Sequence, residues 1–182
     1  MFVAEGSPRS SAELVVLVDD DGTPTGTQEK SEVHHTSTPL HLAFSTHVFD
    51  ADGRILVTRR ALSKRTWPGV WTNSFCGHPG PGESTVDAIA RRADYELGIT
   101  VTDLTPALPD FRYRAVDFSG VVENEICPVY TARCSGQLSP RASEVCQWEW
   151  VEPRQLVEAV RLTPWAFSPW LTLQLPRLYP AE

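Results

Sequence analysis

The sequence predicts an α+β fold, in which a mixed β-sheet is flanked by helices. Segments with the composition of β-strands outnumber helical segments, and most of them occur in pairs joined by short turns. One strongly helical segment lies near the middle of the chain. With 182 residues, of which 41% are hydrophobic, the chain is long enough for one domain with a real core. We expect this domain over residues 13–182, after a flexible leader over residues 1–12.

Two hairpins are expected in the first third of the chain. Residues 13–18 are rich in β-forming side chains, and the Asp-Asp-Asp-Gly stretch that follows lets the chain reverse into residues 23–27. Residues 41–50 and 54–60 form a second pair, because the Asp-Gly turn ending at Gly53 supplies the positive φ angles that tight hairpins need. We expect this second pair to be adjacent and antiparallel.

The central helix has a start signal and a stop signal. Ser84 and Asp87 resemble a capping box with Asp in place of Glu, and a good helical run follows to Leu97. Gly98 then stands where helices commonly end. The sequence therefore predicts a helix over about 84–97.

The second half of the chain is predicted to contain further strands and two helical segments. Residues 111–116 and 121–133 form another candidate hairpin, and residues 145–151 alternate as a strand does. Pro153 can open a short helix to about residue 160. The apolar and aromatic tail over residues 163–175 is expected to dock as a helical closure.

Charge, cysteine content and the N-terminus exclude several classes of protein. The 23 acidic and 16 basic residues give a net charge of −7, which disfavours a nucleic-acid surface. The cysteines show no CxxC spacing and no disulfide framework, so we expect them to be reduced. The first residues lack the pattern of a signal peptide and of a membrane span. We expect a cytoplasmic enzyme, either a monomer or a weak homodimer, with no nucleic-acid or membrane partner.

The segment from Gly77 to Ile99 indicates phosphate chemistry. It reads G-x5-E-x7-R-x4-E-x-G-I and matches most of the Nudix box, G-x5-E-x7-R-E-U-x-E-E-x-G-U, where U is aliphatic. Arg92 and Tyr95 stand where that pattern has glutamates, so two carboxylates that would cluster divalent metals for hydrolysis are absent. On its composition alone, the segment is equally well explained as a surface helix with alternating charges.

Further stretches resemble the type I isopentenyl-diphosphate Δ-isomerases, and they occur in the order found in that family. They are HLAFS, LVTRRALSK, TWPGVWTNSFCGHP, ARRADYELGI, PDFRYRA, GVVENEICPVY and TPWAFSPW, and they span nearly everything after the leader. The resemblance implies a Nudix-like mixed sheet with an additional N-terminal hairpin. It also implies the conversion of isopentenyl diphosphate to dimethylallyl diphosphate, by protonation and deprotonation, in isoprenoid biosynthesis.

Two groups of candidate metal ligands are present. On a strand, Glu123 and Glu125 point to the same face, where paired carboxylates invite a metal ion or a raised pKa. Without the resemblance, acidic side chains turned toward water explain them as well. The resemblance implies that one ion, Mn²⁺, Zn²⁺ or Mg²⁺, is held by His34, His41, His78, Glu123 and Glu125. It also implies that Glu96 holds Mg²⁺ together with the substrate diphosphate.

Cys76 is the sharpest single catalytic candidate. It lies between an aromatic-rich segment and the phosphate loop, where nearby positive charge is expected to lower its pKa. The resemblance implies that Cys76 is catalytic and that Glu125 with Tyr113 delivers or relays the second proton. The other cysteines, Cys127, Cys134 and Cys146, are expected to be buried packing residues.

Basic and aromatic residues complete the expected site. The resemblance implies that four basic residues contact the diphosphate: Lys30, Arg60, Lys64 and Arg92. Only one of Arg59 and Arg60 should face inward, because strand neighbours point in opposite directions, and the resemblance selects Arg60. Trp170 is expected to bind the substrate and stabilise a developing carbocation by cation–π attraction, with Trp67 and Trp71 as alternatives.

Two other functions are compatible with the same fold. A nucleoside-diphosphate hydrolase is disfavoured by the missing glutamates at positions 92 and 95. A non-catalytic ligand sensor is disfavoured because Cys76, Tyr113 and Glu125 supply every titratable role that the isomerisation needs. No redox cofactor is expected.

Overall fold

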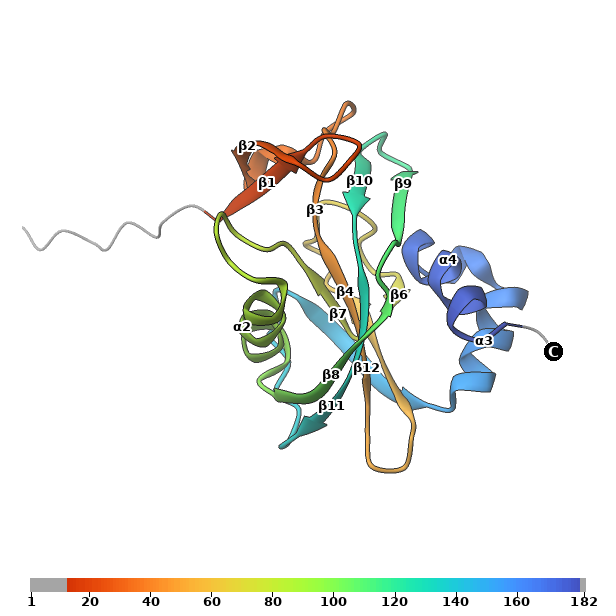
Figure 1. Cartoon of the computed structure of the whole chain (residues 1–182). Helices are drawn as coiled ribbons and strands as arrows, with labels where there is room; N and C mark the ends of the chain where they lie inside the picture. Colours follow the sequence, from red (N-terminus) through yellow and green to blue (C-terminus); the bar gives the residue numbers. More distant parts are fainter. Residues whose placement is uncertain (1–12, 181–182) are drawn as a thin grey trace, which may run out of the picture.

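Two β-sheets, one of five strands and one of seven, form the centre of the protein (Figure 1). The computed structural model describes residues 13–180, so the leader predicted over residues 1–12 lies outside the described residues. The smaller sheet has the order β2 (Pro24–Glu29), β1 (Leu14–Val18), β3 (His41–Leu42), β10 (Val122–Ile126), β9 (Arg112–Val116). The larger sheet has the order β12 (Val145–Val151), β5 (Ile55–Arg60), β4 (Phe44–Phe49), β11 (Val129–Ser135), β8 (Thr100–Leu108), with β6 (Trp71–Thr72) beside β5 and β7 (Phe75–Gly77) beside β4.

Helices cover both faces of the larger sheet (Figure 1). They are α2 (Thr85–Leu97) on one face and α3 (Pro153–Leu162) and α4 (Pro169–Leu178) on the other, with a 3-10 turn over Pro164–Ala166. The short helix α1 (Lys30–Val33) contacts β1 and β2 of the smaller sheet instead. On one face, α2 packs Ile89 and Leu97 against Leu56. On the other face, α3 and α4 pack against Ile55 and Val57. The neighbours Ile55, Leu56 and Val57 therefore serve two separate cores, as the period of two in a strand requires. The α+β class is confirmed.

Two chain segments pass side by side from the smaller sheet into the larger one. The segment β3–β4 leaves the smaller sheet at Ala43, and β10–β11 leaves it at Cys127 and Pro128. Both pairs, β3 with β10 and β4 with β11, are parallel. The segment 121–133, predicted as one strand, is therefore two strands in different sheets. Pro128 has no N–H to donate, so the ladder is interrupted where the chain changes sheets.

The predicted pairing of 41–50 with 54–60 is correct only at the turn. The strands β4 and β5 pair at Phe49 and Ile55 and then separate. The gap is filled by the segment 71–77, whose β6 pairs with β5 and whose β7 pairs with β4. This arrangement matters for the site because it places Cys76 opposite Ser45, between the separated strands.

The central helix begins and ends as predicted. The Ser84 side chain accepts a hydrogen bond from the backbone N–H of Asp87, and Gly98 has the left-handed φ of 65°. The glycine at the start of the pattern, Gly77, has a steric reason: a Cβ there would lie 2.7 Å from Arg92 Cγ and 2.8 Å from Phe44 Cζ. A glycine therefore allows β7 to approach α2 closely.

The remaining elements agree with the sequence, with two exceptions. The N-terminal hairpin, β9, β12, α3 and the helical tail all form near their predicted positions. The strand β8 lies at the edge of its sheet and was not predicted, because it contains Pro106. It is also irregular, with a positive φ of 52° at Asp103. The short helix α1 was not predicted either. Within residues 13–180, no helix is long and apolar enough to cross a membrane.

His47 provides a test of the core. It is fully buried in β4, and its Nε2–H donates to Gln174 Oε1 over 2.9 Å. Burial lowers the pKa of His47 to about 4 from the usual 6.5, although the hydrogen bond with Gln174 opposes the shift.

We therefore expect acid to destabilise the fold through His47. Between pH 6.5 and about 4 the unfolded chain binds a proton on this histidine that the folded chain does not bind. Relative to His47→Gln, the free energy of unfolding of the wild type should fall by up to about 1.4 kcal/mol per pH unit as the pH decreases through this window. Urea unfolding at several pH values measures the difference. A difference independent of pH would contradict the burial of a neutral His47.

Candidate active site

A cavity of about 330 Å³ lies between the two sheets and the helices α1, α2 and α4. Almost every site residue named from the sequence contributes to its lining: Lys30, His34, Arg60, Lys64, Cys76, His78, Arg92, Glu96, Tyr113, Glu123, Glu125 and Trp170. His41 lies behind this lining and is fully buried. Residues far apart in the sequence thus meet in one place.

Three histidines and one glutamate could hold a metal ion. His34, His41, His78 and Glu125 each offer one ligand atom, and these atoms all lie within 4.8 Å of one another. They come from four places in the fold: the end of α1, the start of β3, the residue after β7, and β10. Glu125 stands next to His41 because β10 and β3 pair in parallel at these two residues.

Glu123 lies beside this group of four ligands rather than in it. Its Oε2 is 3.0 Å from His34 Nε2, and its Oε1 accepts a hydrogen bond of 2.7 Å from Thr66 Oγ1. Both glutamates are buried, so the alternative of acidic side chains turned toward water is wrong.

The donor atoms of the histidines suit a divalent ion. His41 Nδ1 donates to the carbonyl oxygen of Pro39 over 2.9 Å, so a neutral His41 has its lone pair on Nε2, which faces the cluster. Four buried atoms of this region make no hydrogen bond of good geometry: His34 Nε2, His41 Nε2, His78 Nδ1 and Glu123 Oε2. This includes the pair His34 Nε2 and Glu123 Oε2, although these two atoms lie 3.0 Å apart. Buried polar atoms are rarely left unpaired, so a ligand shared by several of these atoms fits the set.

The carboxyl of Glu125 is held in its charged form. Burial alone would raise its pKa, but the imidazoles of His41 and His78, which lie 3.5 and 3.1 Å from its Oε1, hold the pKa well below the usual range. The sequence left a raised pKa open for this glutamate, and the direction is the opposite. Burial lowers the pKa of His78 to about 3, which keeps that imidazole neutral, as a metal ligand must be.

Cys76 lies in the cavity wall with two hydrogen-bonding neighbours. Its Sγ is 3.2 Å from Asn73 Oδ1 and 3.5 Å from Ser45 Oγ. The expected lowering of its pKa is wrong. Burial raises the pKa of the thiol to about 12, and the nearby charge of Glu125 adds to this, whereas the charge of Arg60 only partly opposes it.

Tyr113 lies opposite Glu125 in the β9–β10 pair. It is buried, and burial together with the charge of Glu125 raises its pKa well above the usual value. Its ring centroid is 5.8 Å from that of Trp170. The phenol therefore stays protonated beside a carboxylate and an aromatic wall.

The four basic residues that were named from the sequence already have partners in the structure. Lys30 pairs with Glu13 at 3.0 Å, Lys64 pairs with Glu144, and Arg92 lies 2.6 Å from Glu96 and 3.4 Å from Glu144. Arg60 donates to the carbonyl oxygens of Thr66 and Trp67. No local pattern marks Glu13, Glu144 or Thr66, because their roles depend on partners elsewhere in the chain.

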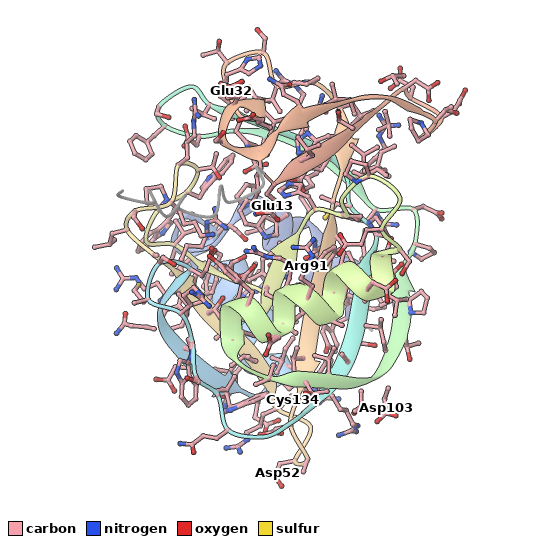
Figure 2. All side chains as sticks on the ribbon, turned by 90° about the vertical axis from the view of Figure 1, so that its left-hand side faces the viewer. Glu13, Glu32, Asp52, Arg91, Asp103 and Cys134 are labelled. Atoms are coloured by element: carbon pink, nitrogen blue, oxygen red, sulfur yellow. The ribbon has the colours of Figure 1, made fainter. Side chains whose placement is uncertain are left out.

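The choice of Arg60 over Arg59 agrees with the structure. Arg60 lines the cavity, whereas Arg59 donates to Gly69 O and Gln147 Oε1 outside it. Glu13, a partner of Lys30, also lies near Arg91 on the side of the molecule that carries α2, as Figure 2 shows.

Trp170 forms an aromatic wall of the cavity and is 1% exposed. Trp67 stands edge-on to it, with ring centroids 5.6 Å apart, and Arg60 Cζ lies 5.2 Å from the Trp170 ring centroid. Trp71, the other alternative for binding the carbocation, does not line this cavity. It lines a second cavity of about 260 Å³ together with Phe167 and residues of α3.

The other three cysteines lie outside the cavity lining. Cys127 is buried as predicted, and Cys134 is half-buried toward the end of the molecule that carries Asp52, away from Glu32 and α1 (Figure 2). Cys146 is exposed, so its predicted burial is wrong. It lies on β12, an edge strand of the larger sheet in which the four successive residues 146–149 are exposed.

Known proteins resemble the chain over most of its length. Residues 39–171 match the NUDIX domain family. A curated protein of Leifsonia xyli subsp. xyli, "Isopentenyl-diphosphate Delta-isomerase", is 67% identical over 93% of each chain. Proteins of the same name from Clavibacter sepedonicus and Kocuria rhizophila are 64% and 61% identical, over 92% and 91% of this chain and 88% and 92% of theirs.

Solved structures share the fold at low sequence identity. A Deinococcus radiodurans crystal structure superposes with a TM-score of 0.71 at 18% identity, covering 92% of this chain and 99% of that one. A MutT protein from Methanosarcina mazei has a TM-score of 0.61 at 18% identity, covering 77% and 93%. At these identities the likeness concerns the fold alone.

The histidine cluster leads to a prediction about metal content. Imidazole ligands favour transition metals over Mg²⁺, so substrate-free protein should carry about one ion per chain. His41→Ala and His78→Ala should lose this ion, because each removes a ligand atom of the cluster. Glu96→Gln should keep it, because Glu96 lies outside the cluster. Inductively coupled plasma mass spectrometry after purification gives the metal content.

His47→Gln is the matched control, since His47 is a buried histidine outside the cluster. An ion content that both alanine variants leave unchanged would contradict the assignment.

Proposed function

The chain belongs to the isopentenyl-diphosphate Delta-isomerase family and carries its Nudix domain, and from this membership we propose that the cavity beside Cys76 is the site of the isomerisation. The enzyme interconverts isopentenyl and dimethylallyl diphosphate, small-molecule substrates of isoprenoid biosynthesis. One observation carries the assignment of the site: a single cavity gathers the Cys76 thiol, the Glu125 carboxylate with the Tyr113 phenol, and the four basic side chains named from the sequence.

The diphosphate is bound at the basic side of the cavity. Lys30, Arg60, Lys64 and Arg92 supply the positive charge, and guanidinium groups can bind phosphate oxygens in pairs. Lys30, Lys64 and Arg92 are paired with carboxylates, so the diphosphate replaces these carboxylates as their partner. Glu96, released from Arg92, is then free to hold Mg²⁺ together with the diphosphate.

The hydrocarbon part of the substrate lies against the aromatic wall. Moving the double bond adds a proton to the terminal carbon and removes one from the carbon two positions away, through a tertiary carbocation. The face of Trp170 stabilises that positive charge by cation–π attraction in a cavity shielded from water.

Two groups exchange the protons. Glu125 acts with Tyr113, its neighbour across the β9–β10 pair, and Cys76 acts from the cavity wall formed by β7. One of them gives a proton to the substrate while the other takes one from it. Neither step breaks a bond of the diphosphate. The residue roles rest on the family resemblance and are supported by the burial and shared lining of these side chains.

A divalent ion fits the donors His34, His41 and His78 together with Glu123 and Glu125. When bound, it would supply concentrated positive charge beside the Glu125 carboxyl. The histidines fix that carboxyl in place through contacts of 3.1 and 3.5 Å to its Oε1. The cytoplasmic location and the monomeric or weakly dimeric state stay predictions from the sequence.

The activity can be tested in heavy water. Purified protein with Mg²⁺ and isopentenyl diphosphate in D₂O should yield dimethylallyl diphosphate and incorporate deuterium into carbon positions, because each proton is exchanged with a titratable side chain. Nuclear magnetic resonance follows both changes. Release of phosphate or pyrophosphate without the allylic isomer would instead indicate a hydrolase.

The proton-exchange roles predict which substitutions stop turnover. Cys76→Ala and Glu125→Gln should each lower kcat by about 10²–10⁴-fold, because each removes a positioned acid or base. Cys134→Ala and Cys146→Ala are matched controls outside the cavity and should keep kcat. Steady-state kinetics of the four variants decides the matter. Near-normal turnover by Cys76→Ala would remove the thiol from the mechanism.

A further inference from the structure

Asn73 stands at the centre of a buried hydrogen-bond network behind the cavity. It is fully buried in the segment between β6 and β7 that fills the gap between β4 and β5. Its amide NH₂ donates to Ser45 Oγ at 2.9 Å, to Phe75 O at 2.8 Å and to Thr46 O at 3.1 Å. These bonds tie the side chain to β4 and β7 on one side.

The carbonyl oxygen of the same side chain faces the cavity wall. Asn73 Oδ1 accepts from Trp170 Nε1 at 2.9 Å, from Cys76 Sγ at 3.2 Å and from Thr72 Oγ1 at 2.9 Å. One oxygen atom thus contacts both the thiol and the indole that line the proposed site. These two residues come from different elements, β7 and α4.

The orientation of the amide follows from its partners. An indole N–H can only donate and a backbone carbonyl can only accept, so Oδ1 must face Trp170 while Nδ2 must face Phe75 and Thr46. Turning the amide over would set donor against donor at Trp170 and acceptor against acceptor at Phe75. In a buried position each such mismatch is strongly unfavourable, because the polar atoms are left without a partner.

We propose that Asn73 is a positioning residue that fixes the positions of the Cys76 thiol and the Trp170 indole relative to each other. The proposal rests on the proposed function of the cavity, and it assigns Asn73 no contact with the substrate, because Asn73 does not line the cavity. Asn73 Oδ1 accepts hydrogen bonds from both the Cys76 thiol and the Trp170 indole, and the NH₂ of the same amide is hydrogen-bonded to β4 and β7. A shift of either group changes the geometry of proton exchange relative to the carbocation.

The first test separates positioning from substrate binding. Asn73→Ala should lower kcat by about 10–100-fold, the cost of a misplacement near 1 Å, while KM changes by less than about threefold because the basic side chains that hold the diphosphate are untouched. Asn73→Asp keeps the Oδ1 acceptor, and in the protonated form that burial favours its hydroxyl can donate to Phe75 O, so this variant should recover part of the lost kcat. A KM effect as large as the kcat effect would overturn the proposal.

Ser74→Ala is the matched control. Ser74 is the next residue and is also fully buried. Its hydroxyl accepts a hydrogen bond from Val48 N–H and donates one to Leu56 O, and its hydrogen bonds within residues 13–180 do not involve Cys76 or Trp170. It should lose stability as Asn73→Ala does and keep its kcat. If both variants lose kcat in proportion to their stability, Asn73 has only a structural role and the proposal is wrong.

The second test does not depend on turnover. The indole N–H of Trp170, identified by its absence in Trp170→Phe, should exchange slowly with D₂O in the wild type and in Ser74→Ala. It should exchange at least about tenfold faster in Asn73→Ala, because its buried acceptor is gone. Equal exchange in all folded variants would overturn the proposal.

The two tests also separate this proposal from the proposed function. If the wild type binds the diphosphate without isomerising it, the function is wrong, while indole exchange still reports on the contact with Asn73. Should Asn73→Ala fail to fold, Asn73→Asp is compared with Trp170→Phe in the same assays. A fall in kcat that is additive in the double variant Asn73→Asp/Trp170→Phe would contradict action through the indole.

Discussion

The site depends on the paired passage of two parallel segments from one sheet into the other. The segments β3–β4 and β10–β11 keep contact while they change sheets, through the hydrogen bonds Ala43 N to Ile126 O and Ser45 N to Pro128 O. The first strands of these segments, β3 and β10, place His41 and Glu125 side by side in the smaller sheet. Backbone N–H and C=O groups that are buried at such a crossing need hydrogen-bond partners. Each segment provides these partners for the other segment. An opening can therefore form between the sheets without leaving buried backbone N–H groups unpaired.

The separation of β4 from β5 is the second requirement for the cavity. These strands diverge beyond Phe49 and Ile55, and the inserted segment 71–77 satisfies the edges of both. This insert is short, and its side chains contribute both to the core and to the lining of the cavity. Phe75 packs in the core with residues of α2 and also lines the cavity, as Cys76 does.

Charge in the cavity is balanced before any substrate binds. Arg92 is 4% exposed and would be costly to bury without a counter-charge, and Glu96 and Glu144 supply that charge. The same carboxylates keep the basic side chains ordered. A diphosphate offers several charged oxygens at once, so it can take over these partners with little change in the number of buried charge pairs.

Several parts of the protein could be predicted from the sequence because their causes are local. The cap at Ser84, the stop at Gly98 and the N-terminal hairpin follow from side-chain chemistry within a few residues. The residues of the site could also be named, because their motifs stand in the order of a recognisable family. Local patterns did not show that β4 and β5 separate, since the intervening segment 71–77 lies beyond the turn that joins them.

The sequence by itself determined the α+β class, the central helix, and which thiol, carboxylates and histidines belong together. Only the tertiary structure decided the electrostatic state of those groups. The pKa of Cys76 is raised rather than lowered because burial outweighs the charge of Arg60, and the pKa of Glu125 is lowered because two histidines from other strands and loops meet it. The hydrogen bonds of Asn73 likewise join β4, β7 and α4. Burial and long-range contact are properties of the packed chain, so no local pattern of residues can specify them.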